Sequence, residues 1–445
     1  MGGGESQVGP ASSVGARIGR TDICMRHIAV LTCLSGLALL LAPAAGLCAP
    51  LKFLRVEMLP SGVEKPYAEI QGVSAGVFEP SFWRKNTLHW MPDQISPLLE
   101  PRPGPNRNIY APSAVETADG WRVFYGAWDG VPTGNDRIYS AVTKDFRRFD
   151  ARHTVIEHGD FHHVCNVNAI ANSDGSFSMV ATAYPDSRGR NKPAFFSSPD
   201  GKVWNGSLEP YVATARDIVS ISGYEKYDDA DINGMNVILR EKGVYRLYFG
   251  NFRDFGQTYR ASGTDGRNYR FEGKAIDGAY AVNDVKKFIT RDGPCYVMGL
   301  HMNRNELWYG LSKDGLRFGE AVTLGKSLSD ADRYIVAIGW VVKGDQEKPG
   351  RRLLGYLYGA GADPGLASNR IFARWLQKKA VFVSDSGSEF APSLARGPDR
   401  QLISTEGARE FHGRMVLYAE DGKTPVARSA PFTLRPGAVY RIAYK

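Results

Sequence analysis

A pattern of short strands, tight turns and aromatic residues recurs along most of this chain. Residues Ser197–Trp204 read SSPDGKVW and residues Ser312–Phe318 read SKDGLRF, and each segment follows a short apolar stretch typical of a strand. Asp and Gly supply the geometry of a tight hairpin turn, and the aromatic residue that follows can pack on the strands. Units of this kind begin near Asn108, His163, Asp231, Asn283 and Asp332. Repeats of about 40 to 50 residues with several strands each are typical of β-propeller blades.

The sequence therefore predicts an all-β protein, a five-bladed β-propeller with a small appended C-terminal β region. The expected boundaries are residues 1–49 for a leader, 50–383 for the propeller and 384–445 for the C-terminal strands. Residues 51 to about 107 are expected to supply the outer strand that closes the propeller. The 49 glycines and the 21 Tyr, 21 Phe and 8 Trp suit many short strands joined by turns.

The first 49 residues have the layout of a secretory signal peptide with a leader. The apolar run Ile28–Leu41 follows Arg26 and His27 and precedes the small residues APAAG. This run is shorter than the ~20 residues of a membrane span, and a retained anchor helix is the alternative. We expect a secreted or periplasmic protein without a stable membrane span once the leader is cleaved.

The cysteine positions bear on disulfide bonds, and the net charge and the motifs bear on the ligands that this protein could bind. Three of the five cysteines lie in the leader, and Cys165 and Cys295 are expected to be buried thiols, with one disulfide as the alternative. The net charge of +8 would suit an anionic carbohydrate ligand, but the basic residues are scattered, which favours a solvated surface with a mild excess of Lys and Arg. We expect no nucleic-acid partner, no cofactor and no metal, because the sequence has no nucleic-acid, metal-binding or nucleotide-binding motif. The neighbours His162 and His163 would face opposite sides of a strand, so they do not easily share one ion.

Several segments resemble the five-bladed furanosidase-like glycoside hydrolases, the superfamily that includes families 43, 32, 62 and 68. The segments that carry the resemblance are Ala111–Val115 (APSAV), Trp121–Trp128 (WRVFYGAW), Met235–Phe252 (MNVILREKGVYRLYFGNF) and the two Asp-Gly turns above. The resemblance covers residues 105 to 382. It implies a carbohydrate site in a central funnel where the innermost strands begin. It also implies three carboxylates from separate blades: a general base, an Asp that modulates pKa, and a general acid.

The chain departs from the family pattern at each matched carboxylate position, where it has Ala111, Asn166 and Asn233. Two hypotheses therefore stay open: a glycoside hydrolase with relocated acids, and a catalytically silent carbohydrate-binding propeller. For the first hypothesis, Asp231 and Asp284 are the candidate acid/base pair and Asp332 is the third catalytic candidate. For each of them, the structural alternative is an Asp that caps a turn at a strand entrance. A propeller that binds proteins through its rim loops is a third hypothesis.

Polar and aromatic residues at the predicted strand beginnings are candidates for sugar binding. The amides and the imidazole can bond sugar hydroxyls, and these residues are Asn108, His163, Asn166, Asn233 and Asn283. The aromatic residues Tyr110, Trp128 and Trp340 can stack on a sugar ring, although core packing is the common role of such residues. Arg253 can bind a substrate carboxylate in bidentate fashion, or it can pair with Asp254 or Asp229.

Overall fold

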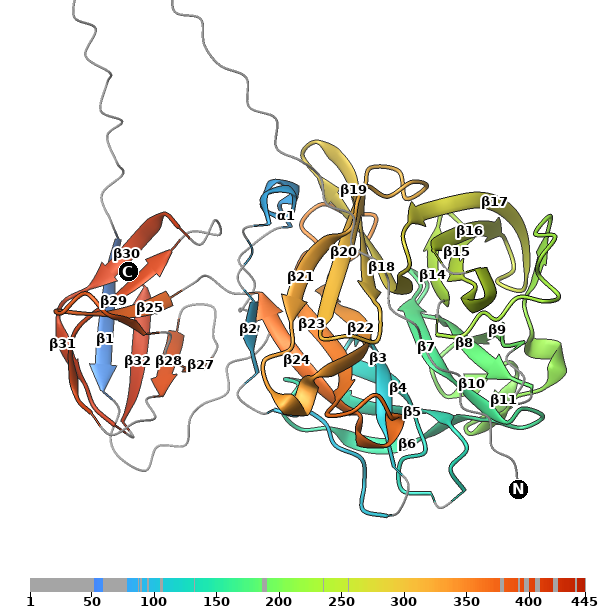
Figure 1. The fold of residues 1–445 in the computed structure, drawn as a ribbon, viewed down its shortest axis with the longest axis horizontal. Coiled ribbons are helices and arrows are strands. Elements are labelled where there is room, and N and C mark those ends of the chain that lie inside the picture. The colour runs from blue at the N-terminus through green and yellow to red at the C-terminus, as the bar shows by residue number, and fades with distance from the viewer. Residues whose placement is uncertain are drawn as a thin grey trace, which may run out of the picture. The chain divides into compact units, whose positions relative to one another are not determined.

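The computed structural model describes residues 52–58 and 78–444, with short gaps between them. The gaps lie at residues 87, 89, 94–95, 105–106, 132, 186–189, 235, 255, 377–379, 391–392, 396–399, 405–408, 419–422 and 437. The predicted signal peptide therefore lies outside the described residues. The expectation of an all-β protein is confirmed, because the described residues form many strands and a single α-helix, α1 (Pro80–Lys85) (Figure 1). No helix in the described ranges is long and apolar enough to cross a membrane.

Five sheets of three to five strands, mostly antiparallel, follow one another along the chain (Figure 1). The first contains β3 (Ile109–Thr117), β4 (Gly120–Ala127), β5 (Arg137–Thr143) and β6 (Asp150–Glu157), with the short β12 (Tyr211–Val212) parallel to β6. The second contains β7 (His163–Ala171), β8 (Phe177–Tyr184) and β9 (Lys192–Ser198).

The remaining three sheets repeat this order. The third contains β14 (Asn236–Glu241), β15 (Val244–Gly250), β16 (Gln257–Gly263) and β17 (Asn268–Asp277), with β13 (Ser220–Ser222) at its edge. The fourth contains β18 (Ala281–Thr290), β19 (Gly293–His301), β20 (Glu306–Ser312) and β21 (Val322–Lys326). The fifth contains β22 (Tyr334–Lys343), β23 (Arg352–Gly361), β24 (Arg370–Leu376) and β2 (Trp90–Pro92), so a strand from before the first sheet forms its outer edge.

The first strands of the five sheets, called the innermost strands below, contact one another in a circular order. β3 contacts β7, β7 contacts β14, β14 contacts β18, β18 contacts β22, and β22 returns to β3. The approach of β22 to β3 is close, since a Cβ added at Gly339 would lie 2.1 Å from the carbonyl oxygen of Pro112. Only glycine permits this contact without a shift of the backbone.

Apolar side chains fill the space between neighbouring sheets. Successive residues of a strand point to opposite faces, so each strand serves two clusters. On β4, Val123 and Tyr125 pack with Leu357 and Trp375 of the fifth sheet, whereas Phe124 packs against the second sheet. Burial on both faces explains why these strands have near-continuous apolar runs.

The repeated Asp-Gly segments form the same turn twice. The Ser198 hydroxyl accepts the Gly201 N–H at 2.7 Å, and the Ser312 hydroxyl accepts the Gly315 N–H at 3.0 Å. Both glycines have positive φ, 77° and 70°, which glycine adopts without strain. The aromatic residues that follow, Trp204 and Phe318, are buried. These segments are structural, as the sequence predicted.

Four of the innermost strands have a register shift near their beginnings, at Tyr110–Ser113 in β3, Cys165–Asn168 in β7, Val282–Asp284 in β18 and Ile335–Ala337 in β22. Ala111 and Asn166 lie in the first two shifts with φ of 48° and 54°. A bulge bends the strand and turns side chains to new directions. The shifts therefore set the directions of the side chains at the strand beginnings.

The C-terminal strands form a separate nine-stranded sheet. Its members are β1 (Lys52–Met58), β25 (Ala380–Ser384), β26 (Glu389–Phe390), β27 (Ser393–Ala395), β28 (Arg400–Ser404), β29 (Phe411–Tyr418), β30 (Pro425–Ser429), β31 (Phe432–Leu434) and β32 (Val439–Tyr444). β1, drawn in blue, pairs in parallel with β30 and antiparallel with β32, which are drawn in red (Figure 1). Leu54 of β1 is buried with Phe382 and Met415. The domain boundaries at residues 50 and 383 stay a prediction, and β1 pairs with the strands that follow residue 383.

Candidate functional site

Three neutral polar side chains meet at the beginnings of β7 and β14. The Asn166 amide nitrogen donates to the Tyr184 hydroxyl at 2.9 Å and to Asn233 Oδ1 at 3.2 Å. The Tyr184 hydroxyl also donates to Asn233 Oδ1. All three residues are half-buried. The sequence predicted Asn166 and Asn233 as ligand-binding residues, and the structure brings them into direct contact.

A second group of polar residues joins the first sheet to the second. The Tyr110 hydroxyl donates to Asp136 Oδ2 at 2.8 Å, and the Asp136 backbone N–H donates to His163 Nδ1 at 2.9 Å. Because His163 Nδ1 accepts, the neutral ring carries its proton on Nε2. The His163 ring lies 5.5 Å from the Tyr184 ring at an angle of 82°, so both groups form one continuous network.

Burial reduces the charge of this network at neutral pH. Burial raises the pKa of Asp136 to about 7, because its effect exceeds the opposite effects of the Tyr110 hydrogen bond and of Arg137. It also lowers the pKa of His163 to about 4, and the neighbouring His162 and His158 contribute to the decrease. His163 is therefore neutral at pH 7, and Asp136 is partly protonated.

Two residues of this network were missed by the sequence analysis. Tyr184 ends β8 opposite His163, and Asp136 lies in the loop before β5. The Cys165 thiol is buried beside Tyr110 and Tyr184, and Cys165 and Cys295 are both free. The expectation of buried thiols is confirmed.

Asn283 belongs to the neighbouring innermost strand β18. Its Oδ1 lies 2.5 Å from Nδ1 of His301, which ends β19. His301 is buried, and burial lowers its pKa to about 4. This pair presents a half-buried amide supported by a neutral imidazole.

Groups of the chain itself engage the carboxylates of Asp284 and Asp332, and the turn-capping alternative fits Asp332 alone. Asp284 Oδ1 accepts from Asn168 at 3.1 Å and from Lys286 at 2.8 Å, and its Oδ2 accepts the Trp340 N–H at 2.8 Å. Asp284 therefore joins the innermost strands β7, β18 and β22. The Asp332 carboxylate accepts backbone N–H groups at the beginning of a short 3-10 helix and the Tyr358 hydroxyl at 2.8 Å.

Asp231 has a different environment. It is half-buried, accepts from the Asn191 amide at 2.7 Å, and lies two residues before Asn233. Burial raises the pKa of Asp231, against the effects of Asn191, Arg253 and Lys192. Asp231 and Asp284 share no hydrogen-bond partner among the described residues, and their role as an acid/base pair stays a prediction. Arg253 is exposed near Asp231, and its binding to a substrate carboxylate stays a prediction.

The prediction that Trp340 stacks on a sugar is wrong. Trp340 is completely buried and packs perpendicular to Trp83 and Tyr356, at ring distances of 5.6 and 5.9 Å. A ligand cannot reach this ring without displacing the core between the fourth and fifth sheets. Tyr110 is also buried, and its hydroxyl is engaged by Asp136.

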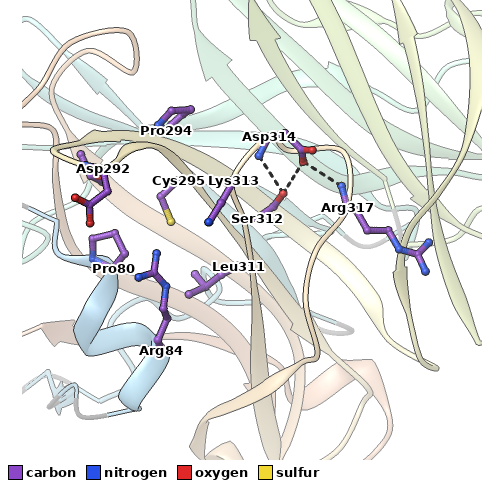
Figure 2. A pocket seen from close by; sticks show the side chains of 11 residues that line it. Pro80, Arg84, Asp292, Pro294, Cys295, Leu311, Ser312, Lys313, Asp314 and Arg317 are labelled. Atoms are coloured by element: carbon purple, nitrogen blue, oxygen red, sulfur yellow. Dashed lines mark hydrogen bonds between the residues drawn. The ribbon is translucent and has the colours of Figure 1, made fainter.

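Two hollows lie apart from the network and share no lining residue with it. One, of about 690 Å³, is bordered by Arg84 of α1 and by Asp292, Cys295 and Lys313 of the fourth sheet, and Figure 2 shows the side chains around it. The other, of about 490 Å³, lies where the innermost strands end. Its wall combines acids and bases: Glu116, Asp174, Arg240, Lys242, Lys286, Asp345, Glu347 and Arg351. The described residues contain no group of three His, Cys, Asp or Glu side chains that could hold a metal ion.

No protein-family model matches the chain, and no curated protein matches its sequence. Solved structures that are similar to it include glycoside hydrolases. They include the catalytic domain of a Coprinopsis cinerea GH62 alpha-L-arabinofuranosidase, with 14% identity, coverage of 65% of this chain and 97% of that chain, and a TM-score of 0.47. An alpha-L-arabinofuranosidase from Podospora anserina, in complex with cellotriose, has 11% identity, coverage of 65% and 96%, and a TM-score of 0.44. A Bacteroides ovatus glycosyl hydrolase has 14% identity, coverage of 72% and 96%, and a TM-score of 0.43. At these values the function has to be argued from the contacts of this chain.

Proposed function

We propose that residues 78–376 form a five-bladed β-propeller that binds a carbohydrate where its innermost strands begin. The circular contacts of β3, β7, β14, β18 and β22 support this architecture. In a propeller the beginnings of the innermost strands converge, and ligands bind in such concave sites.

One observation carries the proposal: the hydrogen-bonded group Asn166, Tyr184 and Asn233, which is neutral and half-buried. A sugar presents many hydroxyls, each of which donates and accepts, and amides with a phenol offer both functions. The rings of Tyr184 and His163 add an apolar surface next to these groups. A neutral network of this kind suits a neutral sugar, and Arg253 at its margin gives an anionic sugar a partner.

Binding without hydrolysis is the function that these contacts support best. Hydrolysis by the usual route needs two carboxyl groups on either side of the glycosidic bond. At the three positions matched to the family carboxylates the chain has Ala111, Asn166 and Asn233, and both oxygens of Asp284 accept hydrogen bonds from groups of the chain itself.

Hydrolysis is the second candidate, because burial raises the pKa of both Asp136 and Asp231. A raised pKa favours the protonated carboxyl that a general acid requires. In this case Asp136→Asn and Asp231→Asn would each reduce the release of sugar steeply.

The test is incubation of the purified protein with a panel of oligosaccharides, including furanosides and uronates, read by mass spectrometry for bound and shortened species. The variants Asn166→Ala and Asn233→Ala should lose retention at least tenfold. Asn172→Ala is the matched control, because this amide follows the opposite end of β7. Retention without cleavage supports binding, shortened products favour the hydrolase, and no retention of any glycan contradicts the proposal.

The leader implies a location for this function. We propose that the protein acts outside the cytoplasm, as a secreted or periplasmic protein, because residues 1–49 have the layout of a signal peptide. Fractionation of the producing cell, followed by N-terminal sequencing of the mature chain, tests this, and an uncleaved cytoplasmic chain would contradict it.

A further inference from the structure

We propose that Asn108, Trp128 and Asn369 form a site for hydroxyl groups at the beginning of the first sheet. The hydroxyls come either from the sugar or from ordered water. The sugar form of this proposal rests on the sugar-binding function above and extends the site beyond Asn166, Tyr184 and Asn233.

The strand register places these three residues at one point of the fold. β3 and β4 pair Ile109 with Ala127 at this end of the ladder, and Asn108 and Trp128 are the next residues of the chain beyond this pair. The carbonyl of Asn369, before β24, accepts the Ile109 N–H at 3.3 Å. The segment that enters β24 is therefore held against the beginning of β3.

These residues bury five polar atoms that have no hydrogen-bond partner among the described residues. They are the amide oxygens and nitrogens of Asn108 and Asn369 and the indole nitrogen of Trp128. Asn108 and Asn369 are 0% exposed, so bulk solvent does not satisfy them. An unsatisfied buried polar atom destabilises the fold, and buried polar groups in folded proteins are almost always bonded. Such a group of unpartnered atoms therefore points to a binding site for polar groups.

The chemistry of the five atoms selects the occupant. The two oxygens accept, whereas the two amide nitrogens and the indole nitrogen donate. None of the three side chains is charged, so the site offers no ionic bond to a phosphate or a metal ion. A hydroxyl group donates and accepts at once and matches this mixture, as in water or a sugar.

The site adjoins the network of the candidate functional site. β4 and β5 pair Ala127 with Arg137, so Asp136 lies at the same end of this sheet as Asn108 and Trp128. Asp136 accepts from Tyr110, which lies two residues after Asn108. Trp128 is half-buried and the two amides are fully buried.

Two variants test the sugar form. Asn108→Leu keeps the approximate size of the side chain and removes both polar atoms, and Trp128→Phe removes the indole N–H and keeps an aromatic ring. Each should weaken binding of the sugar retained by the wild-type protein at least tenfold in isothermal titration. The matched control is Tyr269→Phe in β17, which removes one buried, unpartnered hydroxyl elsewhere and should leave the affinity unchanged.

A crystal structure at high resolution, with and without the sugar, separates the two sources of hydroxyls. Sugar hydroxyls or ordered waters within hydrogen-bond distance of Asn108 and Asn369 support the proposal, with sugar contacts required for its sugar form. The proposal is overturned if both variants keep the wild-type affinity and the crystal structure shows no hydroxyl at Asn108 and Asn369, or shows protein groups bonded to these amides. If the wild-type protein binds no glycan, the sugar-binding function fails. The waters in the crystal then still decide whether the site of Asn108, Trp128 and Asn369 binds hydroxyls.

Discussion

The side-chain amides of Asn166 and Asn233 lie 3.2 Å apart, nitrogen to oxygen, although 67 residues separate them in the chain. One amide belongs to the second sheet and the other to the segment that enters the third. Both stand at positions that the sequence resemblance matches to carboxylates, and together they bind the Tyr184 hydroxyl. This part of the protein is therefore organised by neutral hydrogen bonds.

Restoring one carboxylate should disturb this arrangement. Asn166→Asp removes the donor to Tyr184 and Asn233 and places a charged acceptor against Asn233 Oδ1. We expect a loss of about 1 to 3 kcal/mol in the free energy of unfolding at neutral pH, measured by denaturant titration. Acid should relieve the loss, because a protonated carboxyl donates again. A variant as stable as the wild type at neutral pH would show that these bonds contribute little.

The titration of Asp136 should make stability fall as pH rises. Burial raises its pKa from 3.8 to about 7, so the folded state keeps a proton that the unfolded chain has lost. This stabilisation is fully present below pH ~4 and is lost as pH rises through ~7, with a total change of at most roughly 4 kcal/mol. The difference in unfolding free energy between wild type and Asp136→Asn, measured from pH ~4 to ~8, should show this slope.

His163 and His301 should oppose Asp136 in the same pH range. Burial lowers both pKa values to about 4, so the unfolded chain binds more protons between pH ~4 and 6.5, and stability rises with pH there. A wild-type profile that looks flat is therefore compatible with the Asp136 prediction. A difference between wild type and Asp136→Asn that stays constant with pH is not.

The sequence could identify the amides but not the acid beside them. Asn166 and Asn233 lie in segments with a family pattern, whereas Asp136 lies in a loop without a motif. Its properties arise from burial against Tyr110 and His163, which come from two other strands. Contacts between residues far apart in the chain create this environment, and a local pattern does not contain them.

The same limit explains the wrong prediction for Trp340 and the unexpected pairing of β1. The alternation of residues shows that Trp340 shares a face with its second neighbours. Because the innermost strands are buried on both faces, this pattern does not distinguish a ligand-facing side from the core. For β1, the parallel partner β30 lies more than 350 residues away in the chain. The Asp-Gly turns, by contrast, depend on bonds within a few residues, and the sequence predicted them.

Trp340 should contribute to stability and not to binding. Trp340→Ala leaves a cavity between Trp83 and Tyr356, and such truncations cost about 3 to 5 kcal/mol. We expect this loss in denaturant titration, together with unchanged sugar affinity at a temperature where the variant is folded. Trp128→Phe should show the reverse, a loss of affinity with little loss of stability. Weaker sugar binding by folded Trp340→Ala would contradict the placement of this ring in the core.

Asp284 should prove structural by the same two measurements. In Asp284→Asn the buried Lys286 ammonium loses its carboxylate, 2.8 Å away, in a place where both side chains are almost inaccessible to water. Removing one partner of a buried ion pair costs about 3 to 5 kcal/mol, chiefly because the other charge stays buried without compensation. We therefore expect a large drop in unfolding free energy for Asp284→Asn. The double variant Asp284→Leu with Lys286→Met should recover part of it, because it removes both charges. A catalytic Asp284 predicts the opposite result, an intact fold that has lost turnover. Since the two roles give different combinations of stability and activity, both measurements on the single and the double variant decide between them.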